Sequence, residues 1–358
     1  MRFFSRKKKY KQRLTAILLM LCMLLMVGCG TESVEEASEA PQEKTGISVG
    51  MSFDSFIIER WRRDCDVFVS KINEYDSNAD ITVYSANGDI ETQKQQIRYL
   101  IEKKVDVLVI VCIDSESLTE VCNEAKSAGI PIIAYDRLIK NSNVDLYISF
   151  DNEKVGTLMG EALVEDGLPK KKVLMLSGPN EDNNVSMVET GFRDVMDRNN
   201  IEIVDCIHAP GWKAEAAAEY INTHITEIGN VDAIMCGNDN IATTIIRTLS
   251  EARLAGKIKI VGQDADLEAC QRIVEGTQVM TVYKPVEKLA QAAADYAIQL
   301  AERKEITDVT DTINDGTYDV PYIYLEPIAV TKDNIDETVI DSGFHLKDDV
   351  YLNVPEEK

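Results

Sequence analysis

The chain has 358 residues, of which 45% are hydrophobic and 28% are charged, and its formal net charge is −23. This balance fits a globular protein with buried cores, and it excludes a disordered tail, a collagen-like repeat and a multi-span membrane protein. After residue 28 the chain carries 31 basic against 61 acidic residues. Such an acidic surface repels phosphate backbones, which argues against nucleic-acid binding.

Residues 1–28 have the three parts of a secretory signal peptide. Seven basic residues precede an apolar run from Leu14 to Val27, and Gly28-Cys29 follow it. The run is short for a membrane-spanning helix, although a retained anchor helix is the alternative. Gly28-Cys29 resembles a lipobox, with Met26 where Leu is usual, so Cys29 is expected to be lipidated. Residues 29–45, rich in Glu, Ser and Ala, are expected to be a tether at the outer face of the cell membrane.

From residue 47 short apolar runs alternate with amphipathic stretches that have helical spacing. The first half predicts helices at about 56–74, 89–103, 115–128 and 153–165, and strands at Ile47–Phe53, Ile81–Tyr84, Val105–Val111, Ile130–Tyr135 and Leu146–Phe150. Runs such as VDVLVIV indicate strands that are buried on both faces, as in a parallel sheet covered by helices. This half is therefore expected to form a doubly wound α/β lobe.

The second half repeats this alternation. It predicts helices near 184–198, 213–227, 240–253, 266–275 and 286–302, and strands at Val173–Leu176, Ile201–Ile207, Ala233–Cys236, Ile258–Val261 and Val279–Tyr283. Two successive units of this size exceed the usual length of one domain. The sequence therefore predicts two similar doubly wound lobes with parallel sheets.

The last apolar run, Val320–Val330, contains Pro321 and Pro327. Proline in an extended run favours an edge or crossing segment over a central strand. If this run returns to an earlier lobe, several strands join the lobes and form a multi-strand hinge. We expect lobe 1 to comprise residues 46–150 plus 286–324, and lobe 2 to comprise residues 151–285 plus 325–358.

Polar residues follow four of the predicted strands, where an open α/β sheet places its ligand. These groups are Tyr135-Asp136-Arg137, Gly237-Asn238-Asp239, Gly262 to Asp266, and Tyr283-Lys284-Pro285. Because the carboxyl ends of parallel strands share one edge, the groups can converge on one cleft.

Each polar group also has a structural interpretation. Asp264 or Asp266 can cap the helix that starts at Leu267, and Asn238 or Asp239 can cap the next one along the sheet. Asp182-Asn183-Asn184 has the composition of a turn and helix cap. An exposed Arg60 and a core Trp61 would be ordinary in an amphipathic helix.

The cysteines and histidines do not form a recognisable metal motif. No CxxC occurs, and His208, His224 and His345 are scattered, so we expect no metal and no cofactor. Beyond Cys22 and Cys29, the disulfide state of six cysteines is left open: Cys65, Cys112, Cys122, Cys206, Cys236 and Cys270. Several of them lie at apolar runs, which favours free buried thiols.

The chain resembles the type I sugar-binding proteins of ABC transport systems, in the periplasmic binding protein type I fold. The resemblance extends over about residues 47–350, on the runs ERWRRDCDVFV (59–69), SANGDIETQ (85–93), VDVLVI (105–110), AYDRLI (134–139), DLYISFDNEKVG (145–156), GQDADL (262–267), GTQVMTVYKP (276–285) and TVIDSGFH (338–345).

This resemblance implies a set of sugar-binding residues, namely Arg60, Trp61, Asp136, Arg137, Asn184, Trp212, Asn238, Asp264 and Lys284. The loop before Trp212 departs from the family pattern at His208-Ala209-Pro210, so the course of that loop is left open. The residue types suit a neutral pyranose, because carboxylates accept from hydroxyls, Arg and Lys donate to them, and amides do both. The two Trp rings offer flat faces for C–H surfaces.

The resemblance further implies a lipid-anchored solute-binding protein that binds D-xylose or a related monosaccharide and delivers it to an ABC permease. A xylose sensor that partners a membrane histidine kinase is the alternative. A glycoside hydrolase using Asp136 and Asp264 is disfavoured, because neighbouring cations would keep both carboxylates ionised. A sugar-responsive repressor would need a DNA-binding headpiece where this chain has a signal and tether.

Overall fold

The computed structural model describes residues 46–58 and 60–354. The signal peptide, Cys29 and the tether lie outside the described residues, and those predictions stay predictions. Within the described ranges, no helix has both the length and the apolar character needed to cross a membrane.

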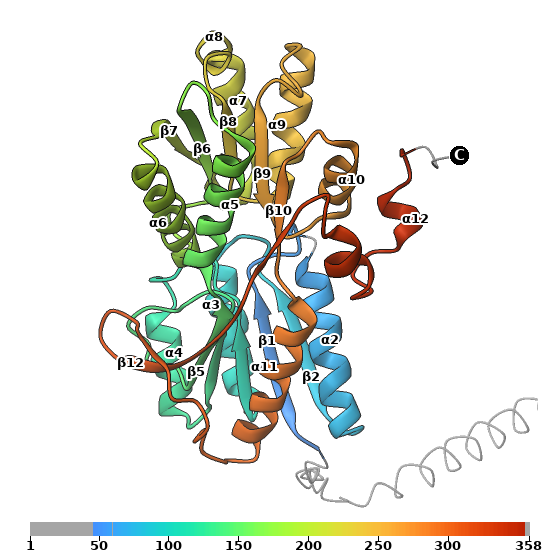
Figure 1. Cartoon of the computed structure of the whole chain (residues 1–358). Coiled ribbons are helices and arrows are strands. Elements are labelled where there is room, and N and C mark those ends of the chain that lie inside the picture. The colour runs from blue at the N-terminus through green and yellow to red at the C-terminus, as the bar shows by residue number, and fades with distance from the viewer. Residues whose placement is uncertain (1–45, 59, 355–358) are drawn as a thin grey trace, which may run out of the picture. The chain divides into compact units, whose positions relative to one another are not determined.

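The described chain forms two α/β lobes, each built around one sheet (Figure 1). The seven-stranded sheet has the order β11-β12-β5-β4-β3-β1-β2 and consists of β1 (Ser48–Phe53), β2 (Asp80–Ser85), β3 (Val107–Ile110), β4 (Ile132–Tyr135), β5 (Leu146–Phe150), β11 (Thr312–Asn314) and β12 (Asp319–Leu325). The six-stranded sheet has the order β13-β10-β9-β8-β6-β7 and consists of β6 (Lys172–Ser177), β7 (Glu202–His208), β8 (Ala233–Cys236), β9 (Lys259–Gln263), β10 (Met280–Tyr283) and β13 (Ile328–Val330). Within the described residues, the β11–β12 and β10–β13 pairs are antiparallel and the other strand pairs are parallel.

Helices cover both faces of the seven-stranded sheet. Alternate strand residues pack in two separate cores: Val107 and Val109 face α2 (Arg60–Tyr75) and α11 (Val286–Ala301), and Leu108 and Ile110 face α3 (Ile90–Glu102) and α4 (Thr119–Ser127). This period-two division is what a strand buried on both faces requires.

The six-stranded sheet is covered in the same way. One face packs against α5 (Asn152–Asp166) and α6 (Asn183–Arg198), and the other against α7 (Ala214–Thr223) and α9 (Asp239–Glu251). The α5–α6 contact is very close, because an added Cβ at Gly156 would lie 1.8 Å from the carbonyl oxygen of Val188. Glycine is therefore required where these two helices cross.

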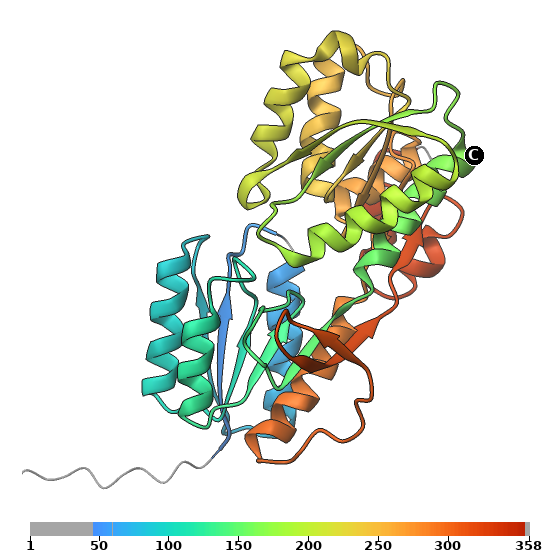
Figure 2. The ribbon, with the colours of Figure 1, turned by 90° about the vertical axis from the view of Figure 1, so that its left-hand side faces the viewer.

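Three segments of chain pass between the lobes (Figures 1 and 2). They are the connections from β5 to α5, from β10 to α11 and from β12 to β13. The remaining elements belong to the second lobe or its C-terminal extension and are α8 (Ile225–Ile228), α10 (Leu267–Glu275), α12 (Lys347–Val350), a 3₁₀ turn η1 (Pro210–Trp212) and a π-helical turn η2 (Asp336–Ile340).

The predicted α/β fold class is confirmed, and the ten strands predicted before residue 284 all lie within two residues of their predicted ends. The predicted helix 213–227 was wrong in one respect: it is interrupted at His224, which separates α7 from α8. The run 320–330 divides into β12 and β13, of which only β13 is an edge strand, because the three-residue β11 covers β12. The proposed residue bounds of the two lobes stay a prediction.

Candidate functional site

A cavity lies where the carboxyl ends of the two sheets face each other. All nine residues predicted from the sequence line it: Arg60, Trp61, Asp136, Arg137, Asn184, Trp212, Asn238, Asp264 and Lys284. None of the nine has more than 9% of its surface exposed. The structure thus brings the complete predicted set together, although their role in binding sugar is not tested by this placement.

Arg60, the first described residue of α2, is held by carboxylates on two sides. Its Nε and Nη2 donate to Asp64, one helical turn on, at 3.2 and 3.1 Å, and Nη2 also lies 2.9 Å from Asp136 Oδ2. Burial lowers the pKa of Arg60, but Asp136 and Asp64 outweigh burial and hold that pKa well above its ordinary value. Because Asp64 also accepts from the Tyr135 hydroxyl, it fixes the guanidinium toward the cavity.

Arg137 links the two lobes. Its Nη1 donates to Asp54 Oδ2 at 2.8 Å within the first lobe, and its Nε lies 2.7 Å from Asp182 Oδ2 at the start of α6 in the second. Burial lowers the pKa of Arg137, but Asp182 and Asp54 reverse this and raise it above its ordinary value. Burial raises the pKa of Asp182, and the nearby Arg137 opposes that rise.

A second contact between the lobes joins Asp136 and Asn184. The Asn184 amide donates to Asp136 Oδ1 at 3.1 Å and to its carbonyl oxygen at 3.0 Å, and Asn184 Oδ1 accepts from the Tyr147 hydroxyl. Asp136 has a φ of 64°, in the left-handed region that few side chains adopt. Strained backbone at a buried polar cluster is a feature of binding sites.

Asp264 and Lys284 form a further ion pair of the cavity, with 3.2 Å between Oδ1 and Nζ. They follow the neighbouring strands β9 and β10, whose parallel pairing sets the two side chains at the same edge. Asp264 also has a positive φ, 97°. This pair confirms the sequence argument that residues after adjacent strands meet.

The two tryptophans occupy different walls. The Arg60 guanidinium lies 4.4 Å from the centroid of the Trp61 ring, whose Nε1 is buried with no hydrogen-bond partner among the described residues. Trp212 donates from Nε1 to Asp182 Oδ2 at 3.2 Å. Its ring packs directly on Gly178, where an added Cβ would lie 2.4 Å from a ring carbon. Trp212 therefore has no room to withdraw from the cavity.

Two of the polar residues also have the structural role of helix cap that the sequence suggested for them. Asn238 caps α9, since its Oδ1 accepts from the Ile241 N–H at 2.9 Å, and Asp182 caps α6 in the same manner. Asp266 occupies the N-cap position of α10 without a side-chain capping bond.

Sequence reasoning did not assign four polar residues of the cavity wall to the site, which are Asn152, Ser177, Asp182 and Gln263. Asp182 had been interpreted only as a cap, and Gln263 stands inside the polar run after β9 but was not selected. The Gln263 Oε1 is buried without a hydrogen-bond partner among the residues described, so it is available to a ligand donor.

The charged side chains that line the cavity balance, with three cations against three carboxylates, while Asp64 and Asp54, which are not part of the lining, also pair with Arg60 and Arg137. Three cations are each paired with a carboxylate, in the pairs Arg60–Asp136, Arg137–Asp182 and Lys284–Asp264. An ionic ligand would have to break one of these buried pairs, at a cost of several kcal/mol for each uncompensated charge. A neutral ligand rich in hydroxyl groups can instead accept from the cations and donate to the carboxylates.

Two α/β lobes, three connecting segments and a buried polar cavity between the sheets define a two-lobed binding protein. Comparison with known proteins agrees, since a family model described as a periplasmic binding protein domain matches residues 49–305. The chain belongs to this family, and the resemblance to type I binding proteins stated from the sequence is confirmed. Members of the family act in the periplasm or outside the cell.

Three curated relatives align with most of the chain. The D-xylose-binding periplasmic protein of Haemophilus influenzae is 42% identical over 85% of this chain and 92% of its own length. The protein of the same name from Escherichia coli is 41% identical over 93% and 98%. The multiple sugar-binding periplasmic receptor ChvE of Rhizobium radiobacter is 30% identical over 84% and 91%. The relatives are solute-binding proteins and not enzymes, which confirms the prediction that this chain is not an enzyme.

Solved structures show the same fold. An ABC transporter solute-binding protein from Clostridium phytofermentans with bound β-D-glucose has a TM-score of 0.77 and 27% identity, covering 85% of this chain and 99% of its own. A carbohydrate transporter solute-binding protein from Chloroflexus aurantiacus in complex with D-glucose has the same TM-score and 25% identity, with 85% and 98% covered.

Proposed function

We propose that this protein binds D-xylose, or a closely related monosaccharide, in the cavity between its lobes and delivers it to an ABC permease. The observation that carries the proposal is the set of nine predicted residues around one charge-balanced cavity. The identity of 41–42% to proteins named for D-xylose binding supports the choice of sugar.

The proposed binding chemistry uses the paired charges directly. Each hydroxyl of a pyranose donates one hydrogen bond and accepts others, so a buried ring needs both partners around its rim. Asp136 and Asp264 accept, Arg60 and Lys284 donate, and the unpaired Trp61 Nε1 adds a neutral donor. Hydrogen bonds to charged groups contribute about 1.5–3 kcal/mol each, so they orient the ring.

Closure of the lobes supplies the mechanism. Arg137–Asp182 and Asp136–Asn184 join residues from different lobes, so both contacts form only in the closed arrangement. A sugar that contacts both lobes binds this arrangement better than an open one and shifts the population toward it. The closed form is then what the permease recognises.

Selectivity for a pentose would follow from the fixed position of the Trp212 ring in the cavity wall. The Trp212 ring is held between Gly178 and the bond to Asp182, so it cannot make room for an extra hydroxymethyl group. A hexose would meet this wall if its CH₂OH pointed there. We expect glucose and galactose to bind more weakly than D-xylose.

The test is a ligand panel on the purified full-length chain in detergent micelles. Thermal unfolding is measured with D-xylose, ribose, arabinose, glucose and galactose, and calorimetry gives the Kd of any sugar that stabilises. A sugar at about 100 times its Kd adds about 2.7 kcal/mol to the free energy of unfolding. A D-xylose-selective shift supports the proposal, whereas a flat panel or a shift with another sugar alone contradicts the choice of D-xylose.

We also propose that Cys29 carries the lipid anchor that holds the protein at the outer face of the membrane. A Cys29→Ala variant should move from the membrane fraction to the soluble or secreted fraction and lose the acyl mass in intact-mass spectrometry. Retention in the membrane fraction would support the uncleaved anchor helix instead.

The alternative partner is a membrane histidine kinase. The receptor name of the Rhizobium radiobacter relative is the observation that favours this second candidate. Crosslinking in cells grown on D-xylose separates the two, because uptake requires capture of a permease subunit and sensing requires capture of a kinase.

A further inference from the structure

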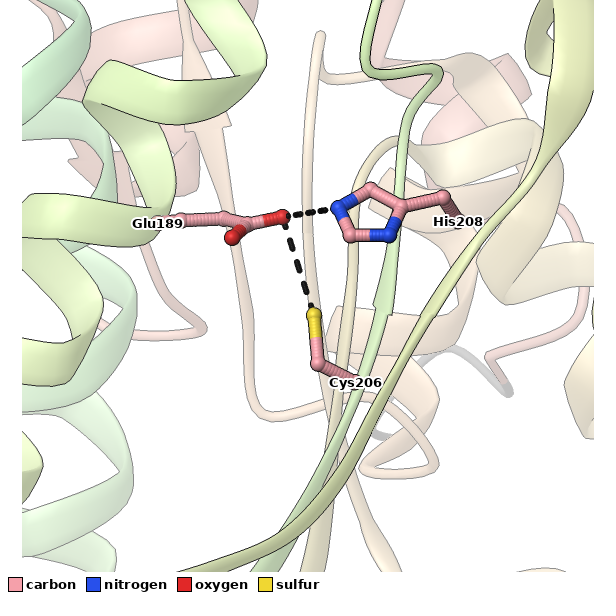
Figure 3. A group of neighbouring side chains, drawn as sticks. All are labelled: Glu189, Cys206 and His208. Carbon is pink, nitrogen blue, oxygen red and sulfur yellow. Dashed lines mark hydrogen bonds and ion pairs between the residues drawn. The ribbon is translucent and has the colours of Figure 1, made fainter.

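A second cluster of polar side chains lies in the second lobe and consists of Glu189, Cys206 and His208 (Figure 3). Cys206 and His208 are two residues apart on β7, so both point to the same face of this edge strand. Glu189 comes from α6, which packs over that face, and its carboxylate points at both side chains. The cluster is thus formed by packing of a helix on a strand.

The three potential ligand atoms are already close to one another. Glu189 Oε1 is 2.8 Å from His208 Nε2 and 3.7 Å from Cys206 Sγ, and all ligand atoms lie within 4.8 Å of one another. Around a tetrahedral zinc ion with bonds of about 2.0–2.3 Å, such atoms are roughly 3.5 Å apart. Shifts of less than about 1 Å, within the reach of side-chain rotation, would create that geometry.

We propose that Glu189, Cys206 and His208 bind a divalent transition-metal ion of the zinc class. Thiolate, imidazole and carboxylate together select zinc-like ions over Ca²⁺ and Mg²⁺, which prefer oxygen ligands only. Three protein ligands leave the fourth position of a tetrahedral site to water, and the side chains of His208 and Glu189 are 28% and 15% exposed, which gives the ion a path from solvent.

The surroundings suit a dication. A divalent ion with one thiolate, one carboxylate and one neutral imidazole has no net charge, so binding leaves no uncompensated charge in this half-buried place. Arg193 Nη2 lies 3.5 Å from Glu189 Oε2, whereas His208 contacts the other carboxylate oxygen, Oε1. Arg193 can therefore keep its contact with Glu189 when Oε1 binds the ion. Ser177 also hydrogen-bonds Glu189 and provides a further outer partner.

A reactive thiol is the competing role for Cys206. Without a bound ion, burial and the nearby Glu189 raise the pKa of Cys206 to about 11, so the thiol is protonated and a bound dication must displace this proton to solvent. Nucleophilic cysteines have lowered pKa values beside cations. The neighbours of Cys206 therefore do not suit a nucleophile.

The experiment is a Co²⁺ titration of the metal-stripped full-length chain in detergent micelles, followed by absorbance. We expect a thiolate-to-cobalt charge-transfer band in the near ultraviolet and tetrahedral bands in the visible range, which saturate at one Co²⁺ per chain and disappear when Zn²⁺ is added. Cys206→Ser should abolish the charge-transfer band, and His208→Gln should weaken Co²⁺ binding at least tenfold. Cys65→Ser is the matched control, because Cys65 is also a half-buried free thiol but lies on α2.

A control for folding separates a lost metal site from an unfolded variant. Far-ultraviolet circular dichroism of each variant shows whether it folds, and the conservative His208→Gln variant gives a second result if Cys206→Ser does not. Absence of a charge-transfer band in the unmodified chain, or an unchanged band in Cys206→Ser, would overturn the proposal. Equal losses in Cys65→Ser and Cys206→Ser would also overturn it, because binding would then not depend on this cluster.

Discussion

Replacing Gly178 by alanine puts a methyl group into space that the Trp212 ring occupies. The added Cβ would lie 2.4, 2.6 and 2.7 Å from three atoms of that ring. Carbon atoms pack best at about 3.5–4.0 Å, so the ring must move by about 1 Å.

This displacement breaks a specific bond. Trp212 Nε1 donates to Asp182 Oδ2 at 3.2 Å, and a shift of about 1 Å takes that separation beyond hydrogen-bonding range. A hydrogen bond to a charged group contributes about 1.5–3 kcal/mol, and about 1.4 kcal/mol corresponds to a factor of ten in Kd. Since Asp182 also holds Arg137 across the lobes, we expect the Kd for D-xylose to rise about 10- to 100-fold.

Two assays follow this change. Calorimetry gives the Kd, and tryptophan fluorescence reports the ring itself, because Trp61 and Trp212 are the only tryptophans of the chain. Gly229→Ala is the matched control, since its added Cβ would make ordinary contacts no closer than 3.5 Å. Unchanged affinity and fluorescence in Gly178→Ala would refute the reasoning, and an equal loss in both variants would assign the effect to backbone stiffening.

Three further outcomes are expected. Asp264→Asn leaves the buried Lys284 without its counter-charge and should weaken D-xylose binding at least tenfold in calorimetry; unchanged affinity would contradict the assigned role. Burial raises the pKa of Asp239 from 3.8 to about 7, so between those values the folded chain holds a proton that the unfolded chain has released. Relative to Asp239→Asn, the free energy of unfolding should therefore fall by about 1.4 kcal/mol per unit as pH rises from about 4 to 7, and equal slopes in urea unfolding would refute this. Gly156→Ala forces α5 away from Val188 of α6 and should cost about 3 kcal/mol in urea unfolding, and a loss as small as that of Gly229→Ala would show that the helices separate easily.

The strands and the cavity could be predicted for the same reason. A parallel sheet buries both faces, so VDVLVIV is apolar almost throughout, and the carboxyl ends of such strands share an edge. Asp136, Asp264 and Lys284 were found because each directly follows a strand. The left-handed φ of Asp136 and Asp264 depends on tertiary contacts, and no residue type in their runs signals it.

Other features could not be predicted because they depend on how elements pack. Asp182 was interpreted as a helix cap, which it is, but its second oxygen also binds Arg137 and Trp212. Cys206 and His208 stand two residues apart on β7, and their third partner, Glu189, comes from a helix packed on that strand. Rules that search for ligands along the chain therefore missed this cluster and led to the expectation of no metal site.

The order of strands in the seven-stranded sheet also constrains the order in which the chain can fold. β12 pairs with β5 through contacts such as Tyr322 with Tyr147, and all strands of the other sheet except β13 are encoded between them. The first sheet therefore stays incomplete, with the edge of β5 unpaired, until nearly the whole chain is available to fold. Strand pairs between residues far apart in the sequence form slowly, and until they form the unpaired strand edge is prone to aggregation. Chains that end before β12 leave the β5 edge unpaired, so we expect proteases or chaperones to bind them. The pairing of this one late strand therefore distinguishes complete chains from truncated ones.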